Sequence, residues 1–395
     1  MSANDPVIVS ISRTPLTRRV RPGKGDPPVT ETLLTSVITD AVSRVRLPRN
    51  VVQDVCVGNV LGGSAAAVTA RVAVLKTLGY EVPVRTTNRQ CSSGLQAIAD
   101  ISSAIKSGSI ECGLAIGYEN MSFNTMENSF GDGPDVEEED VEDDGIDSIT
   151  LSAVMTPMGQ TSENVSQKYN ITRSTQDKLS IKSHSKAVLA WKERKFDYEL
   201  IPNYIKPKIG YPDNGIRVDT SKITTLPPAF SETGTTTAGN SSQITDGAAC
   251  VCLMSRRLAE ERGLKVLATF LGYAVSGVPP RIMGIGPTTA IPAALKLSKT
   301  SINDINLFEI NEAFASQASH CISHLKIPPS KVNVNGGAIA LGHPLGCTGA
   351  RLVVSLVAEL GRRGGGKGVV SMCVGTGMGA AAVLEVEGRE EKSKL

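Results

Sequence analysis

The sequence predicts an α/β fold made of two duplicated mixed-sheet units, the first of which is interrupted by a long insertion. Apolar runs of strand length alternate with stretches of helical periodicity, which is typical of a largely parallel sheet covered by helices. Parts of this pattern occur twice. The run Val52–Val57 recurs as Ile302–Leu307, and a cysteine before a helix occurs at Cys91 and again at Cys347, so the offsets are 250 and 256 residues.

The final strand of the first copy comes later in the sequence, relative to its other elements, than the final strand of the second copy. Gly247–Val251 recurs as Gly379–Val383 at an offset of only 132 residues, so about 120 residues are inserted before it. We therefore predict an N-terminal domain from 1–121 and 246–271, an inserted loop domain at 122–245, and a C-terminal domain at 272–395.

Each element of the first copy follows from its local pattern. Apolar runs bounded by Gly, Pro or Asn predict strands, and apolar residues spaced by three or four predict helices. In order these are the strand Val7–Ile11, a helix at 30–45, the strand Val52–Val60, a helix at 66–78, the strand Val82–Thr87, the helix after Cys91 and the strand Cys112–Gly117.

The insertion has a different composition. Nine of the thirteen residues at 132–144 are acidic, which predicts a solvated loop. A polar helical stretch at about 162–195 and a Pro- and Thr-rich segment to Gln243 follow.

Bulk properties exclude several classes of function. A net charge of +2 over 395 residues favours neither nucleic acid nor an anionic membrane as a partner, and no apolar run is long enough to span a bilayer. The eight cysteines contain no CxxC pair, which is typical of a reducing compartment. The C-terminal Ser393-Lys394-Leu395 predicts recognition by a peroxisomal import receptor, in peroxisomes or a related microbody.

Cys91 is the first candidate for chemistry. It precedes a helix whose apolar residues, among them Leu95, Ile98 and Ile105, share one face. The amino terminus of a helix stabilises a thiolate, which is a good nucleophile for a carbonyl carbon. The alternative is an inert buried cysteine of the core.

Three further segments carry the remaining candidates: Asn311–Ala315, Gly336–Gly349 and Met372–Gly377. Together with Asn88–Gly94, they resemble the motifs of the thiolase family. The resemblance runs in order from Val7 to Val386 and includes Met158–Asn164 and Thr237–Ser242. Details such as Cys91–Gly94 and Leu226–Phe230 are most similar to peroxisomal 3-ketoacyl-CoA thiolases, whereas the acidic stretch 132–144 departs from the family pattern.

The resemblance implies a role for each residue. Cys91 would be the nucleophile that holds the acyl group, and His343 would activate it. Asn311 would orient a water in an oxyanion hole, and the N–H groups of Cys91 and Gly375 would form a second one. Cys373 would be the acid and base for the enolate and for CoA.

The resemblance also implies a layered αβαβα fold, a homodimer, and CoA as a co-substrate with no metal or other cofactor. The inserted domain would bind substrate and CoA, with Ser242 beside the pantetheine and Met158 and Phe314 as its apolar lining. Arg217 is a candidate for the nucleotide phosphates from its charge and position. His184, His320 and His324 lie outside the motifs and are interpreted as structural.

The leading hypothesis is an acyltransferase that cleaves 3-ketoacyl-CoA with CoA, giving acetyl-CoA and a shortened acyl-CoA in fatty-acid β-oxidation. One alternative is an acetoacetyl-CoA thiolase that works in the synthetic direction. A non-catalytic acyl-CoA carrier could have lost Cys91, Asn311, His343 or Cys373, yet all four are present. A ketoacyl synthase of related fold would lack Cys373.

Overall fold

The computed structural model describes residues 2–20, 25–126, 145–202 and 211–388. The acidic stretch 132–144 and Ser393–Leu395 therefore lie outside the described residues. The described strands are β1 (Pro6–Arg13), β2 (Thr17–Arg18), β3 (Asp54–Gly58), β4 (Val84–Thr87), β5 (Cys112–Asn120), β6 (Thr245–Ser255), β7 (Ala268–Gly277), β8 (Ile305–Ile310), β9 (Gly365–Val374) and β10 (Met378–Glu387). The described α-helices are α1 (Thr30–Arg44), α2 (Ala65–Thr77), α3 (Ser93–Lys106), α5 (Leu151–Val154), α6 (Met158–Lys168), α7 (Arg173–Lys192), α8 (Arg256–Glu261), α9 (Gly286–Leu297), α10 (Ala315–His324), α11 (Ala338–Leu341) and α12 (Leu345–Arg362).

The strands form one path in the order β4-β3-β5-β6-β1-β7-β10-β9-β8, with β2 paired to β6. Its two halves have matching topology. In the first half β3 runs parallel to β4 and β5, and β6 and β1 are antiparallel additions. In the second half β8 runs parallel to β9, and β10 and β7 are antiparallel additions. Only two residue pairs join β1 to β7. The predicted duplication and mixed sheets are confirmed; the three domain boundaries stay a prediction.

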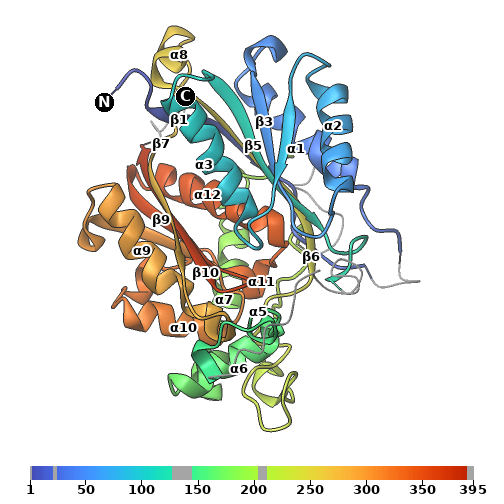
Figure 1. Cartoon of the computed structure of the whole chain (residues 1–395), viewed down its shortest axis with the longest axis vertical. Helices are drawn as coiled ribbons and strands as arrows, with labels where there is room; N and C mark the ends of the chain where they lie inside the picture. Colours follow the sequence, from blue (N-terminus) through green and yellow to red (C-terminus); the bar gives the residue numbers. More distant parts are fainter. Residues whose placement is uncertain (1, 21–24, 127–144, 203–210, 389–395) are drawn as a thin grey trace.

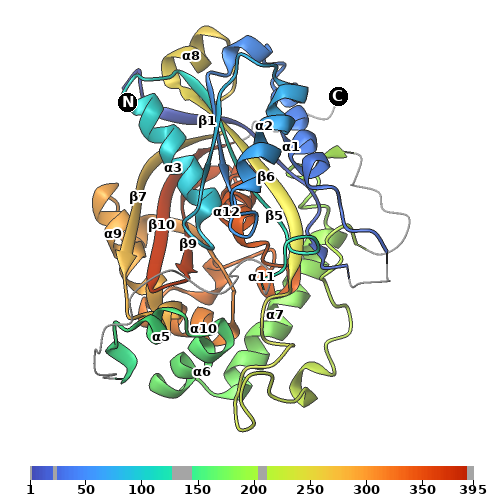
Figure 2. The ribbon, with the colours of Figure 1, turned by 45° about the vertical axis from the view of Figure 1, so that its right-hand side comes forward.

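Three hydrophobic clusters lie between five layers, as the predicted αβαβα arrangement requires (Figures 1 and 2). One cluster joins α1 and α2 to an outer sheet face, and a second joins α9 to the other outer face. The third cluster surrounds α3 and α12, which lie between the two halves of the sheet. The predicted apolar face of α3 is buried at Leu95, Ile98, Ile101 and Ile105. α12 is therefore buried along almost its whole length, whereas α3 buries its apolar face and leaves Ser103 and Lys106 exposed.

Glycines let α3 and α12 approach closely. A Cβ added to Gly94 would lie 2.6 Å from the Gly346 carbonyl oxygen, and one added to Gly349 would lie 2.3 Å from the Leu95 nitrogen. Both contacts are with backbone atoms, which cannot rotate away. This approach brings together the two motif segments at the starts of these helices.

The two copies differ where the motifs lie. Cys91 precedes α3 by two residues, but Cys347, predicted to precede its helix, lies inside α12, because that helix begins at Leu345. Gly117 lies within β5, whereas Gly375 follows β9. The first copy therefore leaves its cysteine in a turn, and the second buries its cysteine completely.

The predicted single polar helix at 162–195 is two helices. α6 begins four residues earlier, at Met158, and Asn170 then adopts a left-handed φ of 54°. Thr172 caps α7 by accepting a hydrogen bond from the Thr175 N–H. Asn tolerates the left-handed conformation and Thr favours the cap, so the local chemistry breaks the helix.

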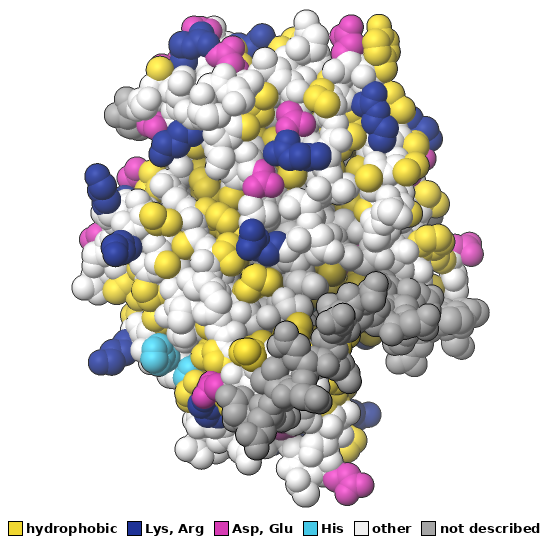
Figure 3. Space-filling view, in the orientation of Figure 1, with side chains coloured by type: hydrophobic (Ala, Val, Ile, Leu, Met, Phe, Trp, Pro, Cys, Tyr) yellow, Lys and Arg dark blue, Asp and Glu magenta, His cyan; other side chains and the backbone are white. Residues whose placement is uncertain are grey.

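The face drawn in Figure 3 mixes Lys and Arg with Asp and Glu, without a field of one sign. Among the described helices, none has both the length and the apolar character needed to cross a bilayer.

Candidate active site

Cys91 lies in a tight turn between β4 and α3. Gln90 has a left-handed φ of 45°, and the N–H groups of Ser92 and Ser93 donate to the carbonyls of Arg89 and Gln90 at 3.0 Å each. The Cys91 side chain is half-buried, and its sulfur accepts a hydrogen bond from the Gly375 N–H. A turn of the first half of the sheet therefore meets the end of β9 in the second half.

The charge state of Cys91 differs from our expectation of a thiolate. Burial raises the pKa of the thiol to about 11, although the Gly375 N–H opposes this shift. Cys91 lies before the first turn of α3, where the helix terminus offsets only part of the cost of burying a charge. At neutral pH, Cys91 is therefore a thiol, and its reactivity requires a base.

His343 is the candidate for that base: its lowered pKa leaves the imidazole neutral and able to accept a proton at pH 7, but also makes it a weak base. It lies two residues before α12, and burial, with the charge of Arg351, lowers the pKa of its imidazole to about 3. Thr348 Oγ1 lies 2.6 Å from His343 Nδ1 and 2.9 Å from the Pro344 carbonyl oxygen. A carbonyl can only accept, so the hydroxyl proton points to Pro344, and Nδ1–H donates to Thr348. This assigns the lone pair to Nε2.

Asn311 lies beside this imidazole. Its Nδ2 is 3.4 Å from His343 Nε2, and Gln317 donates to its backbone carbonyl at 3.0 Å. The Asn311 side chain is fully buried, and its Oδ1 has no hydrogen-bond partner among the described residues. Asn311 thus offers one donor and one acceptor at the position of the basic nitrogen.

Cys373 is fully buried near the end of β9, in a small apolar cluster with Met283 and Ala313. Burial raises the pKa of its thiol well above the usual value, and the neighbouring Cys91 raises it further. Cys373 is therefore protonated at neutral pH and close enough to Cys91 for the two thiols to interact. This thiol can therefore act as an acid only toward a strongly basic group.

The predicted apolar lining is brought to the same place. Met158 and Phe314 pack against the Cys373 cluster, and the Ser242 N–H donates to the Ala313 carbonyl at 2.9 Å. Phe230 meets Phe314 edge to face with ring centroids 6.1 Å apart. These residues form one apolar approach to Cys373.

Arg217 lies elsewhere. Its backbone N–H donates to His184 Nδ1 at 3.2 Å, and its side chain lines a hollow of about 250 Å³ together with Lys192. This hollow shares no lining residue with the Cys373 cluster. The role of Arg217 at the nucleotide phosphates stays a prediction.

Glu119 links two segments that lie next to the site residues. Its buried carboxylate accepts hydrogen bonds from the N–H of Gly346 at 2.9 Å and from the N–H groups of Val60 and Leu61 at 3.1 Å each. Asn59 Nδ2 donates as well, at 2.8 Å. Burial raises the pKa of Glu119 to about 7 against these four donors. One carboxylate therefore holds the loop after β3 against the start of α12.

Thr348, Phe230 and Glu119 were missed as site residues by sequence reasoning. Thr348 and Phe230 lie inside segments that resemble the thiolase motifs. The motifs therefore included both residues, but they did not predict which groups the two side chains contact. Glu119 lies 227 residues from Gly346, and no local pattern signals that bond.

The duplicated α/β scaffold, in which Cys91 of one half lies beside the buried Cys373 thiol of the other, indicates an acyltransferase that works through cysteine chemistry. Family models described as "Thiolase, N-terminal domain" and "Thiolase, C-terminal domain" match residues 6–257 and 264–386. The chain belongs to the thiolase family.

Relatives and solved structures agree over nearly the whole chain. "3-ketoacyl-CoA thiolase A, peroxisomal" of Mus musculus is 48% identical over 98% of this chain and 92% of its own length. The human "3-ketoacyl-CoA thiolase, peroxisomal" is 46% identical, again over 98% of this chain and 92% of its own. The dimeric peroxisomal thiolase of Saccharomyces cerevisiae superposes with a TM-score of 0.87 at 41% identity, covering 98% of both chains. Human mitochondrial 3-ketoacyl-CoA thiolase in complex with CoA has a TM-score of 0.84 at 34% identity, covering 97% of this chain and 98% of that one.

Proposed function

We propose that the chain cleaves 3-ketoacyl-CoA with CoA, in peroxisomal fatty-acid β-oxidation, through a covalent acyl group on Cys91. The observation that carries this proposal is the meeting of a nucleophile, a base and an acid from different halves of the sheet. Cys91 accepts a hydrogen bond from the Gly375 N–H and lies beside the buried Cys373 thiol, and His343 Nε2 carries its lone pair beside Asn311 Nδ2. The names of the peroxisomal relatives support the substrate and the compartment.

In the first half-reaction His343 Nε2 takes the proton of the Cys91 thiol, and the sulfur attacks the keto carbon of the substrate. The bond between Cα and Cβ breaks, and its electron pair leaves with the acetyl-CoA enolate. Cys373 S–H protonates this enolate, so the acyl chain remains on Cys91 as a thioester. The raised pKa of Cys373 suits this step, because the proton is present when the carbanion forms.

In the second half-reaction the Cys373 thiolate removes the proton of the CoA thiol, whose sulfur attacks the thioester. Cys91 leaves as a thiolate and recovers its proton from His343. Two donors support the oxyanions: the Gly375 N–H beside Cys91, and a water that donates one hydrogen bond to Asn311 Oδ1, an atom without a partner among the described residues. A preorganised donor of this kind contributes about 3 kcal/mol.

CoA and acyl-CoA enter along the approach lined by Met158, Phe314 and Phe230, with Ser242 at its edge. These apolar side chains suit a pantetheine arm and an acyl chain better than a charged nucleotide. No metal or other cofactor takes part in the proposed steps, since thiols and one imidazole supply every proton transfer.

We also propose a homodimer formed through α2 and β4. Val68, Val72 and Leu75 recur at helical spacing on α2 and are 66%, 36% and 43% exposed. β4 ends the sheet path, with β3 as its one described neighbour, so its outer edge has no described partner strand. Val68→Asp should shift the protein to monomer in light scattering, whereas Val218→Asp, at a comparably exposed valine, should not. A dimeric Val68→Asp protein would contradict this interface.

Import into peroxisomes would use Ser393-Lys394-Leu395 as the signal for the import receptor. The peroxisomal names of the relatives support the compartment, and the tripeptide supplies the route.

Mass spectrometry of the protein mixed with 3-ketoacyl-CoA, without CoA, tests the proposed function. An acyl adduct is expected on the Cys91 peptide, and Cys91→Ser should abolish both adduct and turnover. An adduct on another cysteine would remove Cys91 from this role. A ladder of substrate chain lengths then separates the alternative, because activity confined to the four-carbon substrate would indicate an acetoacetyl-CoA thiolase.

A further inference from the structure

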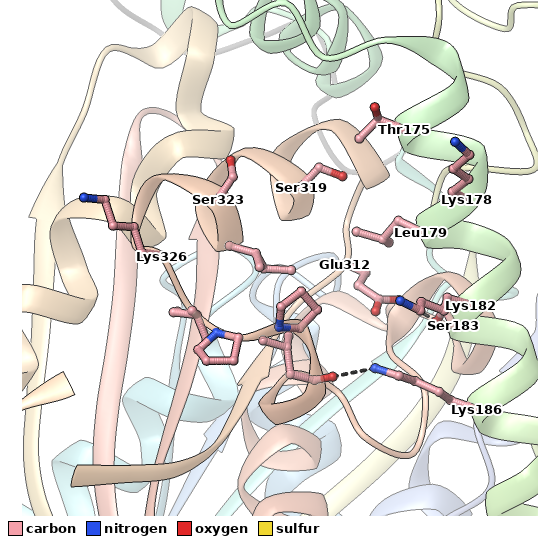
Figure 4. A pocket seen from close by; sticks show the side chains of 15 residues that line it. Thr175, Lys178, Leu179, Lys182, Ser183, Lys186, Glu312, Ser319, Ser323 and Lys326 are labelled. Carbon is pink, nitrogen blue, oxygen red and sulfur yellow. Dashed lines mark hydrogen bonds between the residues drawn. The ribbon is translucent and has the colours of Figure 1, made fainter. Parts of the chain in front are cut away.

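A second cavity, of about 560 Å³, lies between α7 and α10 (Figure 4). Its lining comes from α7, from α10 and from the segment that follows α10. None of Cys91, His343, Cys373 and Asn311 lines it, and neither do Met158, Phe314 and Ser242. Its volume lies within the range of sites for small organic ligands, roughly 300–1,000 Å³.

The rim of this cavity is basic. Lys178, Lys182 and Lys186 recur every four residues along one face of α7, and Lys326 lies on the other side (Figure 4). The Lys186 ammonium donates to the Val332 carbonyl at 2.7 Å. In the described part of the chain, Lys178, Lys182 and Lys326 form no ion pair. Burial lowers the pKa of Lys186, and the charge of Lys182 adds to this shift, so the lysines repel one another.

The one acidic residue of the lining offsets only part of this positive charge. Glu312 is buried and already accepts hydrogen bonds from Ser183 Oγ at 2.6 Å, Asn333 Nδ2 at 2.8 Å and the Ile339 N–H at 3.3 Å. These hydrogen bonds link α7 to the segments that contain Asn333 and Ile339. The charge of Glu312 raises the pKa of Lys186, and among the described residues no ion pair joins Glu312 to Lys178, Lys182 or Lys326.

The wall between the lysines is apolar. Leu179 of α7, Ile322 of α10, and Ile327 and Val332 after α10 all line the cavity. One polar atom interrupts it: Ser319 Oγ is buried and has no hydrogen-bond partner among the described residues. A ligand that suits this cavity combines an apolar body with an anionic end.

We propose that the cavity between α7 and α10 binds a fatty carboxylate. Its alkyl chain lies against Leu179, Ile322 and Val332, and its carboxylate lies among Lys178, Lys182 and Lys326. An inorganic anion would leave the apolar wall unused, and a neutral lipid would leave the ammonium groups without a counter-charge.

Isothermal titration of the full-length protein with laurate tests this site, with dodecanol and inorganic phosphate as the neutral and the purely polar probe. Lys182→Glu should weaken laurate binding at least tenfold, because it reverses one of the charges that face the carboxylate. Lys296→Glu is the matched control, since it makes the same change at an exposed lysine of α9 outside the cavity lining and should alter the affinity less than twofold. Added salt should weaken binding to the wild type, as for exposed charges.

A second variant tests the apolar part. Ser323→Trp places a bulky ring at an exposed lining position of α10 and should also weaken laurate binding at least tenfold. All three variants should keep the thiolysis rate of the wild type, which checks their folding. Laurate binding that survives Lys182→Glu and Ser323→Trp, or that falls equally in Lys296→Glu, overturns the site. Phosphate binding as tightly as laurate overturns the fatty-carboxylate assignment.

Discussion

Gly349→Ala tests whether the close approach of α3 and α12 sets the geometry of catalysis. The added Cβ would lie 2.3 Å from the Leu95 nitrogen, whereas ordinary contact begins at 3.4 Å. The helices must therefore separate by about 1 Å at this point. Cys91 lies just before α3 and His343 just before α12, so the separation acts directly on nucleophile and base.

The expected loss is large in rate and small in stability. A displacement of about 1 Å in a catalytic group costs about 100-fold in rate. Replacing a helical glycine with alanine favours the helix by about 1 kcal/mol, while overpacking costs about 1–3 kcal/mol. The free energy of unfolding should therefore fall by no more than about 2 kcal/mol, and the variant should remain folded.

The assay is the single-turnover rate of acyl-Cys91 formation, read by mass spectrometry beside kcat and thermal unfolding. Gly277→Ala is the control, because a Cβ added there meets nothing within 4 Å. Acylation by Gly349→Ala within threefold of the wild type, in a folded protein, would refute the idea that helix contact sets the distance between Cys91 and His343. An equal loss in Gly277→Ala would refute it as well.

Three further predictions concern other parts of the chain. Glu119→Gln should lower the free energy of unfolding at pH 8 by about 2–5 kcal/mol and reduce kcat, because the NH₂ group of the amide would point at two of the four donors. A urea midpoint of unfolding equal to that of the wild type would contradict this. Burial and the charges of Arg217 and Arg18 lower the pKa of His184 from 6.5 to about 4. Between these two pH values the unfolded chain binds a proton at this residue and the folded chain does not, so the free energy of unfolding falls as the pH falls. Between pH 7 and pH 4 the wild type should lose about 3 kcal/mol more than His184→Gln, and parallel urea-unfolding curves would count against the shift. Deleting Ser393–Leu395 should leave thiolysis unchanged and keep the tagged protein in the cytosol, whereas continued import would require another signal.

Local patterns in the amino-acid sequence were enough to predict the architecture and most of the candidate residues. Apolar periodicity predicted the buried face of α3, because residues three or four apart in a helix lie on the same side. The repeated segments predicted the matching halves of the sheet, and the motifs marked Cys91, Asn311, His343 and Cys373. These signals are local, or they compare one local pattern with another.

How these residues act depends on contacts that form only in the folded chain. The thiol state of Cys91 follows from its burial, which no residue near it in the sequence encodes. The tautomer of His343 follows from Thr348 and Pro344 together, and the bond from Glu119 to Gly346 spans 227 residues. Hydrogen bonds and desolvation depend on distances of a few ångström between atoms, and distant segments reach such distances only once the five layers have packed.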